Sequence, residues 1–339
     1  MNKQVAYPSR FWIKNQAMPY LLIIDDMHPS LHAALDQNNI SYDYLPDIAP
    51  QSVGAQLQKG YQGLILRSKI QVTKDFLQKY GNELTFIGRA GAGVDNIDVY
   101  ALSQQQITLI HTPEGNRDAV AEHSLGMLLT LLNHLHIADR EVRQGKWYRE
   151  ANRGLEIKGK TIGIIGFGNT GQAVAKRLQG FDCQILVYDR KPKLDPIPSY
   201  IQATSLDHIC AQADIITLHI PLDTENYHWV NDDFFARCQK PIFLINAARG
   251  PVLDLGALCR ALENGRVRGA CLDVLENEKL DSLSLTEQVH FDYLRQSKRV
   301  LLTPHIAGWT YESYQRISEV MAKKVVKWHK AHMLPTHSR

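Results

Sequence analysis

Three segments in the second half of the chain carry side chains that together could oxidise an alcohol. Arg249 follows the apolar run 242–245, Asp273 and Glu278 lie in a turn-like stretch, and His305 follows a proline after the run 301–302. Oxidation of a secondary alcohol needs a base for the hydroxyl proton, a partner that holds the base, and a cation for the carboxylate and carbonyl oxygens. Each residue alone has an ordinary structural explanation, but the set predicts this chemistry.

A glycine-rich segment supplies a possible cofactor site. Residues 160–171 read KTIGIIGFGNTG, an apolar strand followed by G-x-G-x-x-G and a helix-like stretch. In that context Gly166 permits a tight turn, Gly168 lets the backbone approach a pyrophosphate, and Gly171 allows close packing of helix and strand. The amides of Asn169, Thr170 and their neighbours at the helix N-terminus then face the phosphates.

Asp189 ends the next expected strand, 185–188. A carboxylate there accepts hydrogen bonds from the adenosine ribose and repels a 2′-phosphate, so NAD is preferred over NADP. Arg190 and Lys191 follow directly and weaken this inference, because either could turn toward a phosphate.

Short apolar runs alternate with helical patterns along the chain, and this alternation is typical of a parallel α/β sheet. The strands and helices that it predicts would position the residues named above. At 339 residues we expect two domains. The predicted fold is α/β, with two Rossmann-like or flavodoxin-like doubly wound parallel sheets. Residues 1–111 with 310–339 are expected to form the substrate domain, and 112–309 the NAD domain.

The expected helices include one near 29–38, a long one from about Ala119 to Arg143, and a final one near 311–331. Asn116 to Asp118 are expected to cap the long helix.

Composition narrows the class of protein. The net charge of +3 is mild and its basic residues are dispersed, which favours neither nucleic acid nor a membrane surface as partner. No apolar run is long enough to cross a bilayer, and the N-terminus lacks a secretory signal pattern. The five cysteines show no metal-ligand or disulfide-like spacing. We therefore expect a cytoplasmic protein without a bound metal.

Taken together, the motifs resemble the D-isomer-specific 2-hydroxyacid dehydrogenase family. The similarity extends over about residues 60–330, and the order Arg, Glu, His is that of the family's catalytic residues. It rests on GRAGAGVDNIDV (88–99), HTPEGN (111–116), AEHSLGMLL (121–129), the glycine segment, HIPL (219–222), NAARGPVLD (246–254), LDV (272–274) and PHIAG (304–308). The resemblance implies an active site in the cleft between two domains.

The resemblance also implies roles for single residues. His305 is expected to be the general base in alcohol oxidation and the acid in ketone reduction. Glu278 would hydrogen-bond to it and raise its pKa, with Glu276 as the alternative partner. Arg249 would bind the carboxylate and polarise the C2 oxygen.

Further positions are expected to contact cofactor or substrate. The cofactor set adds His219, Pro221, Ala247, Ala248, Asp273 and Ala307. The substrate set is Arg67, Arg89, Gly91, Ala92, Gly93 and Arg149.

Within the family, the chain is most similar to the D-3-phosphoglycerate dehydrogenases. This implies NAD-dependent oxidation of 3-phosphoglycerate in serine biosynthesis, and a homodimer formed through the long helix. Two alternatives stay open: reduction of glyoxylate, hydroxypyruvate or another short 2-keto acid, and an NAD(H)-sensing corepressor-like module. The family's larger members carry a C-terminal serine-sensing domain that this sequence lacks, so feedback control by that route is not expected.

Overall fold

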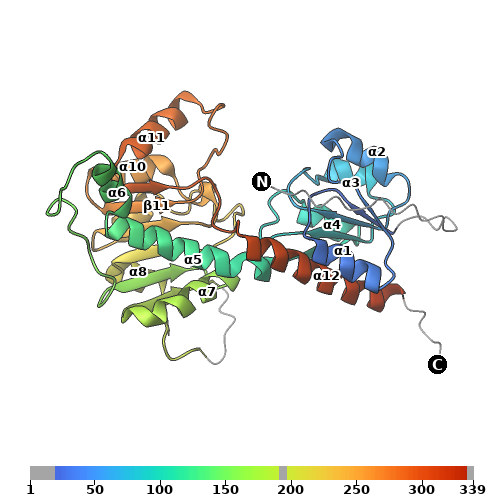
Figure 1. Cartoon of the computed structure of the whole chain (residues 1–339), viewed down its shortest axis with the longest axis horizontal. Helices are drawn as coiled ribbons and strands as arrows, with labels where there is room; N and C mark the ends of the chain where they lie inside the picture. Colours follow the sequence, from blue (N-terminus) through green and yellow to red (C-terminus); the bar gives the residue numbers. More distant parts are fainter. Residues whose placement is uncertain (1–19, 191–196, 334–339) are drawn as a thin grey trace. The chain divides into compact units, whose positions relative to one another are not determined.

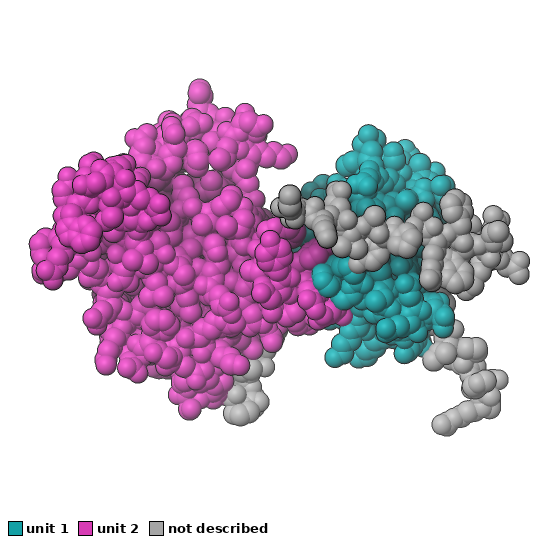
Figure 2. Space-filling view, viewed as in Figure 1, with its two compact units in different colours: residues 1–90, 96–111, 321–339 teal, residues 91–95, 112–320 magenta. Residues whose placement is uncertain are grey.

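The computed structural model describes residues 20–190 and 197–333 (Figure 1). It divides into two compact units (Figure 2). Unit 1 comprises residues 1–90, 96–111 and 321–339, and unit 2 comprises 91–95 and 112–320.

Unit 1 is built on a five-stranded parallel sheet. Its strand order is β2-β1-β3-β4-β5, so the chain reverses direction across the sheet between β1 and β3. The elements are β1 (Leu21–Ile23), α1 (Pro29–Gln37), β2 (Tyr42–Tyr44), a 3₁₀ turn (Pro50–Ser52), α2 (Val53–Leu57), β3 (Gly63–Leu66), α3 (Lys74–Tyr80), β4 (Phe86–Arg89), α4 (Val99–Gln104) and β5 (Thr108–His111).

The last helix of the chain, α12 (Tyr311–Met333), contributes its C-terminal part to unit 1. The rings of Phe86 and Trp328 lie 4.7 Å apart, and a side chain at Gly88 would meet Met321 at 3.0 Å. A glycine in β4 therefore lets this helix pack closely on the sheet.

Unit 2 contains a seven-stranded parallel sheet of order β12-β11-β10-β9-β6-β7-β8. The strand order reverses between β6 and β9. Its elements are α5 (Pro113–Leu132), α6 (Leu135–Arg143), β6 (Thr161–Ile165), α7 (Asn169–Leu178), a 3₁₀ turn (Gln179–Phe181), β7 (Gln184–Tyr188), β8 (Gln202–Ala203), α8 (Leu206–Gln212), β9 (Ile215–Leu218), α9 (Asp232–Arg237), β10 (Ile242–Asn246), a 3₁₀ turn (Gly250–Val252), α10 (Leu255–Glu263), β11 (Val267–Leu272), α11 (Leu285–Gln296) and β12 (Val300–Leu302).

Both faces of this sheet are covered by helices. Alternate residues of β10 point to opposite faces, with Leu244 in the core under α8 to α11 and Ile245 in the core under α5 and α7. A strand buried on both sides needs apolar residues at nearly every position, which is why the runs in the sequence are continuous. The predicted fold class of two parallel α/β sheets is confirmed.

The prediction of one long helix from Ala119 to Arg143 is wrong in two respects. The helix begins at Pro113, whose fixed φ suits the first helical position, and Thr112 precedes it without a side-chain cap. It also ends at Leu132, because His134 adopts a left-handed conformation (φ 53°) before α6 begins. The helices predicted near 29–38 and 311–331 are confirmed.

The sequence-based domain ranges stay a prediction; the compact units differ from them at residues 91–95 and 310–320, which belong to unit 2. No helix within the described residues is long and apolar enough to cross a membrane.

Candidate active site and NAD site

The chain turns sharply at the carboxyl end of β6. Gly166 follows the strand with a φ of 91°, and α7 begins three residues later at Asn169. Because β6 borders the point where the strand order reverses, this is where doubly wound sheets bind their ligands. The free amides at the N-terminus of α7 suit a pyrophosphate.

The three glycines of this turn fit a dinucleotide. A Cβ at Gly166 would lie 2.4 Å from the carbonyl oxygen of His219, and one at Gly171 would lie 2.1 Å from that of Gly166. A Cβ at Gly168 would meet nothing within 4 Å. Two glycines are therefore required by the protein's own packing, while Gly168 faces open space, as the approach of a ligand requires.

His219 lies beside the turn, in the loop after β9. Its backbone N–H donates to the carbonyl of Ile165 at 2.7 Å, and its Nε2 lies 2.9 Å from the hydroxyl of Thr217. Burial lowers the pKa of His219 to about 4. Its Nδ1 is buried and has no hydrogen-bond partner within residues 20–190 and 197–333. A buried ring nitrogen without a partner next to the glycine turn is consistent with a ligand there.

Asp189 stabilises the glycine turn through its carboxylate. Its Oδ2 accepts a hydrogen bond from the backbone N–H of Phe167 at 2.7 Å. Arg190 forms ion pairs with Asp223, at 3.4 Å, and with Glu225. Lys191 lies outside the described residues.

The other predicted cofactor positions lie on loops of unit 2, and their contacts with NAD stay a prediction. These are Asn169 and Thr170 in the first turn of α7, Pro221 in the loop after β9, Ala247 and Ala248 after β10, and Ala307 after β12.

The catalytic candidates follow three neighbouring strands, β10, β11 and β12. Asn246 pairs in register with Leu272, and Leu272 with Leu302, so the loops that carry the candidates leave the sheet at the same edge. This arrangement brings together residues that are far apart in the sequence.

His305 and Glu278 form a direct pair. Nδ1 of His305 lies 2.9 Å from Oε2 of Glu278, and both side chains are about half exposed. The hydrogen bond with Glu278 raises the pKa of His305, while burial and the charge of Arg249 oppose the rise. Glu276 does not contact His305; it accepts the N–H of Leu255 at the start of α10 instead.

Asp273 organises the turn that carries His305. The carboxylate is buried and accepts hydrogen bonds from the hydroxyl of Thr303 (2.6 Å) and the backbone N–H groups of Ile306 (2.9 Å) and Ala307 (2.8 Å). These contacts stabilise His305 at a φ of 54°, an uncommon conformation for a residue other than glycine. The expected contact of Asp273 with the cofactor stays a prediction.

His123 also contacts this turn, and the sequence reasoning missed it. Its Nε2 lies 3.1 Å from the Thr303 hydroxyl and 3.5 Å from Asp273. The only sequence signal was its place in AEHSLGMLL, a motif to which no role had been given.

Arg249 has a carboxylate partner that the sequence reasoning also missed. Its Nε donates to Oδ2 of Asp95 at 2.8 Å, and its Nη1 donates to the carbonyl of Ala248 at 2.6 Å. A Cβ at Gly93 would lie 1.5 Å from Nη2 of Arg249. Gly93 is therefore required for the loop 91–95 to pack against this guanidinium, and Asp95 fixes its orientation.

The amide of Gly91 has a partner within the protein, because its N–H donates to the Thr112 hydroxyl at 2.8 Å. The contact of Gly91 with the substrate stays a prediction. The predicted substrate positions in this loop are Gly91, Ala92 and Gly93, and of these Gly93 lies against Arg249.

Two predicted substrate residues belong to unit 1. Arg67 follows β3, next to the point where the strand order of that sheet reverses. Its backbone N–H donates at 2.6 Å to the carboxylate of Asp25, which follows β1. Arg89 ends β4, where its Nη1 donates to the carbonyl of Ala90 at 3.4 Å. Arg149 is exposed in a turn between α6 and β6 of unit 2.

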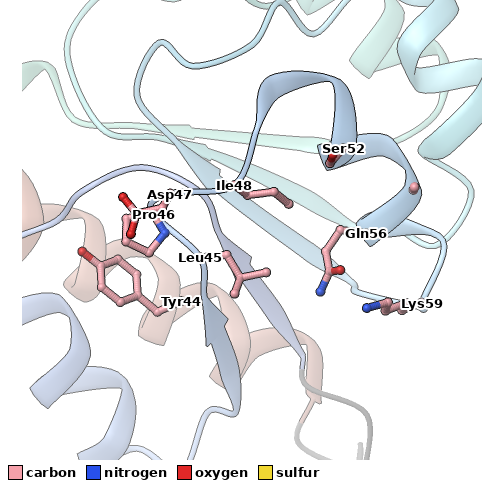
Figure 3. A pocket seen from close by; sticks show the side chains of 9 residues that line it. Tyr44, Leu45, Pro46, Asp47, Ile48, Ser52, Gln56 and Lys59 are labelled. Carbon is pink, nitrogen blue, oxygen red and sulfur yellow. The ribbon is translucent and has the colours of Figure 1, made fainter. Parts of the chain in front are cut away.

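A hollow of about 590 Å³ lies on unit 1 between the end of β2 and α2 (Figure 3). No predicted site residue lines it, and its lining consists of Tyr44, Leu45, Pro46, Asp47, Ile48, Ser52, Ala55, Gln56 and Lys59.

Comparison with known proteins identifies the family of the chain. The family model described as "D-isomer specific 2-hydroxyacid dehydrogenase, NAD binding domain" matches residues 125–307, more than half of the chain. That range contains the glycine turn, Arg249, Glu278 and His305.

Curated relatives include two kinds of enzyme. D-3-phosphoglycerate dehydrogenase of Homo sapiens is 34% identical over 309 residues, which are 90% of this chain and 56% of the relative. Glyoxylate reductase of Thermofilum pendens is 39% identical over 259 residues, 74% of each chain. The chain thus spans about half the length of the phosphoglycerate dehydrogenases that it matches.

Solved structures with the same fold cover nearly the whole chain. D-lactate dehydrogenase from Aquifex aeolicus, complexed with NAD and lactic acid, has a TM-score of 0.78 and 26% identity and covers 92% of this chain and 96% of its own. A glyoxylate reductase from Paecilomyes thermophila has a TM-score of 0.79 at 24% identity, covers 91% of this chain and 95% of its own, and supports the fold alone.

Proposed function

Because this chain belongs to the D-isomer specific 2-hydroxyacid dehydrogenase family, with NAD as its cofactor, we propose that it transfers a hydride between C2 of a D-2-hydroxy acid and NAD. The observation that carries the proposal is the hydrogen bond between His305 and Glu278, in the same unit as Arg249 and the glycine turn.

The residues divide the chemistry between them. In alcohol oxidation, Nε2 of His305 removes the hydroxyl proton, and Glu278 at Nδ1 stabilises the imidazolium that forms. Arg249 binds the substrate carboxylate and polarises the C2 oxygen, held in place by Asp95. NAD held at the glycine turn and Asp189 would supply the acceptor for the hydride that leaves C2 as the C2–O bond becomes a carbonyl. In the reverse direction His305 returns the proton.

Glu278→Gln is expected to move the pH profiles. The hydrogen bond and charge of Glu278 raise the pKa of His305, so His305 should have a lower pKa in the variant than in the native protein. Oxidation needs the neutral imidazole, so its kcat/KM should reach its plateau at lower pH. Reduction needs the imidazolium, so its activity should be lost at lower pH than in the native protein.

Profiles of kcat/KM against pH in both directions measure this shift. Glu276→Gln is the matched control, because Glu276 accepts the backbone N–H of Leu255 at the start of α10 and forms no hydrogen bond with His305. Unchanged profiles for Glu278→Gln would mean that Glu278 does not set the protonation of the base.

We propose 3-phosphoglycerate as the substrate, oxidised to 3-phosphohydroxypyruvate as in serine biosynthesis. Support comes from the 34% identity to phosphoglycerate dehydrogenases and from arginines expected to bind a second anionic group. Guanidinium groups suit phosphate because they donate two parallel charge-assisted hydrogen bonds. It is the resemblance, not the structure, that assigns Arg67, Arg89 and Arg149 to the same substrate as Arg249.

Arg67→Ala tests this assignment. Loss of a charge-assisted contact should raise KM for the phosphorylated substrate by about 10- to 100-fold. D-Glycerate and glyoxylate lack the phosphate. We expect the native protein to turn them over more weakly than the phosphorylated substrate, and the variant should change their KM little. A substrate panel followed by NADH absorbance makes the comparison, with Lys74→Ala, an exposed unit 1 residue, as control.

The same panel decides between the proposal and the runner-up. A reductase of glyoxylate, hydroxypyruvate or another short 2-keto acid is favoured by the 39% identity to a glyoxylate reductase. If the native protein prefers these small acids, they and not 3-phosphoglycerate are its substrates. NAD(H) binding without turnover of any acid would instead indicate a corepressor-like binding module.

We further propose that the protein is a cytoplasmic homodimer. Apolar side chains stay exposed on α6 and in the segment after it, among them Leu135, Val142, Trp147 and Tyr148. Burying them against a second copy removes this surface from water. Sedimentation equilibrium measures the mass directly, and a monomer at all concentrations contradicts the proposal.

A further inference from the structure

Two acidic residues in one loop of unit 2 hold Arg190, the residue directly after Asp189. Asp223 lies 3.4 Å from its guanidinium through Oδ2, and Glu225 contacts its other terminal nitrogen. Asp223 also fixes the loop, since its Oδ1 accepts the backbone N–H groups of Glu225 (3.0 Å) and Asn226 (2.8 Å). The two carboxylates are thus presented by an ordered turn.

These ion pairs cross the end of the cofactor site. Arg190 follows β7 and the acidic loop follows β9, while β6 lies between these two strands in the sheet. A side chain that joins the two loops therefore spans the carboxyl end of β6, where the glycine turn is. Asp189 marks the same place as the position of the adenosine ribose.

The charges at this place disfavour a 2′-phosphate on the adenosine ribose. Two carboxylates, those of Asp223 and Glu225, contact the guanidinium of Arg190, and a third, that of Asp189, belongs to the residue before it and binds the glycine turn. An arginine at this position is well suited to bind a 2′-phosphate through parallel hydrogen bonds. Here its donors are already directed to the acidic loop.

We propose that Asp223 and Glu225 are specificity-determining residues that select NAD against NADP. They hold Arg190 away from the position of a 2′-phosphate and add negative charge that repels it. Asp189 sets the preference through the ribose, and the acidic loop prevents the neighbouring arginine from reversing it. This inference rests on the NAD site and not on the substrate proposed above.

The double variant Asp223→Asn, Glu225→Gln tests the proposal. Asparagine keeps an acceptor oxygen for the turn, so the loop conformation is retained while both charges are removed. The Kd of NADPH, measured by fluorescence titration without substrate, should fall at least about tenfold relative to that of NADH. The gain should shrink as salt is added, because the interaction is electrostatic.

Two further variants make the test specific. Adding Arg190→Ala to the double variant should abolish most of the gain, since the freed guanidinium is the group that binds the phosphate. The matched control is Asp118→Asn, Glu122→Gln, which changes the charge equally and frees Arg177 from a similar pair of carboxylates. Its ratio of the two Kd values should equal the native ratio.

An unchanged ratio in the double variant would overturn the proposal, as would an equal gain in the Asp118 and Glu122 control. Retention of the gain after Arg190→Ala would do the same, because Arg190 would then have no part in it. Since these titrations need no turnover, they stay informative if no hydroxy acid is a substrate.

Discussion

Replacement of His305 by alanine should lower kcat by about 100- to 10,000-fold, the usual contribution of a general base. The imidazole acts on the substrate proton and not on the cofactor, so the Kd of NADH should stay unchanged. Steady-state turnover and a fluorescence titration of NADH on the same preparation measure the two quantities. Turnover near the native rate would remove His305 from the catalytic role.

The backbone at His305 calls for a second variant. With a φ of 54°, the position disfavours alanine, whereas asparagine adopts this conformation more readily. His305→Asn should therefore keep the turn held by Asp273 and still lose the rate. His208→Ala, an exposed histidine on α8, is the control and should keep full activity.

Replacement of Arg249 by alanine should have an effect of similar size. Loss of a preorganised donor to the developing charge costs about 100- to 1,000-fold in kcat, and KM should rise as well because the substrate carboxylate loses its partner. Arg249→Lys keeps the charge but not the planar fork, so it should recover only part of the activity.

Asp95→Asn separates positioning from direct contact. It leaves Arg249 in place but removes the charge that orients it, so kcat/KM should fall by less than in Arg249→Ala. Arg260→Ala, which breaks an exposed ion pair with Asp232, is the control and should be silent. Native kinetics in Arg249→Ala would exclude the arginine from the site.

Local features were predictable from sequence because they depend on neighbouring residues. The glycine turn is one: Gly166 needs its positive φ and Gly171 its close contact within a single strand–turn–helix unit. Strands buried on both faces are another, since they require continuous apolar runs. The parallel sheets and the placement of Arg249, Glu278 and His305 after strands follow from these patterns.

Tertiary structure decided what depends on residues far apart in the chain. Glu276 and Glu278 are two residues apart and chemically alike. Only the path of the loop brings Glu278 to His305, while Glu276 accepts the backbone N–H of Leu255 in α10. The Thr112 hydroxyl accepts the N–H of Gly91 and makes no capping hydrogen bond to α5. The sequence by itself thus determined the two parallel sheets, the glycine turn and the first catalytic candidates, because short-range sterics and burial specify those. It did not determine the break between α5 and α6. The partner of each charged group was decided only by the fold, because Asp95 meets Arg249, and Asp223 meets Arg190, across distances in sequence that no local pattern encodes.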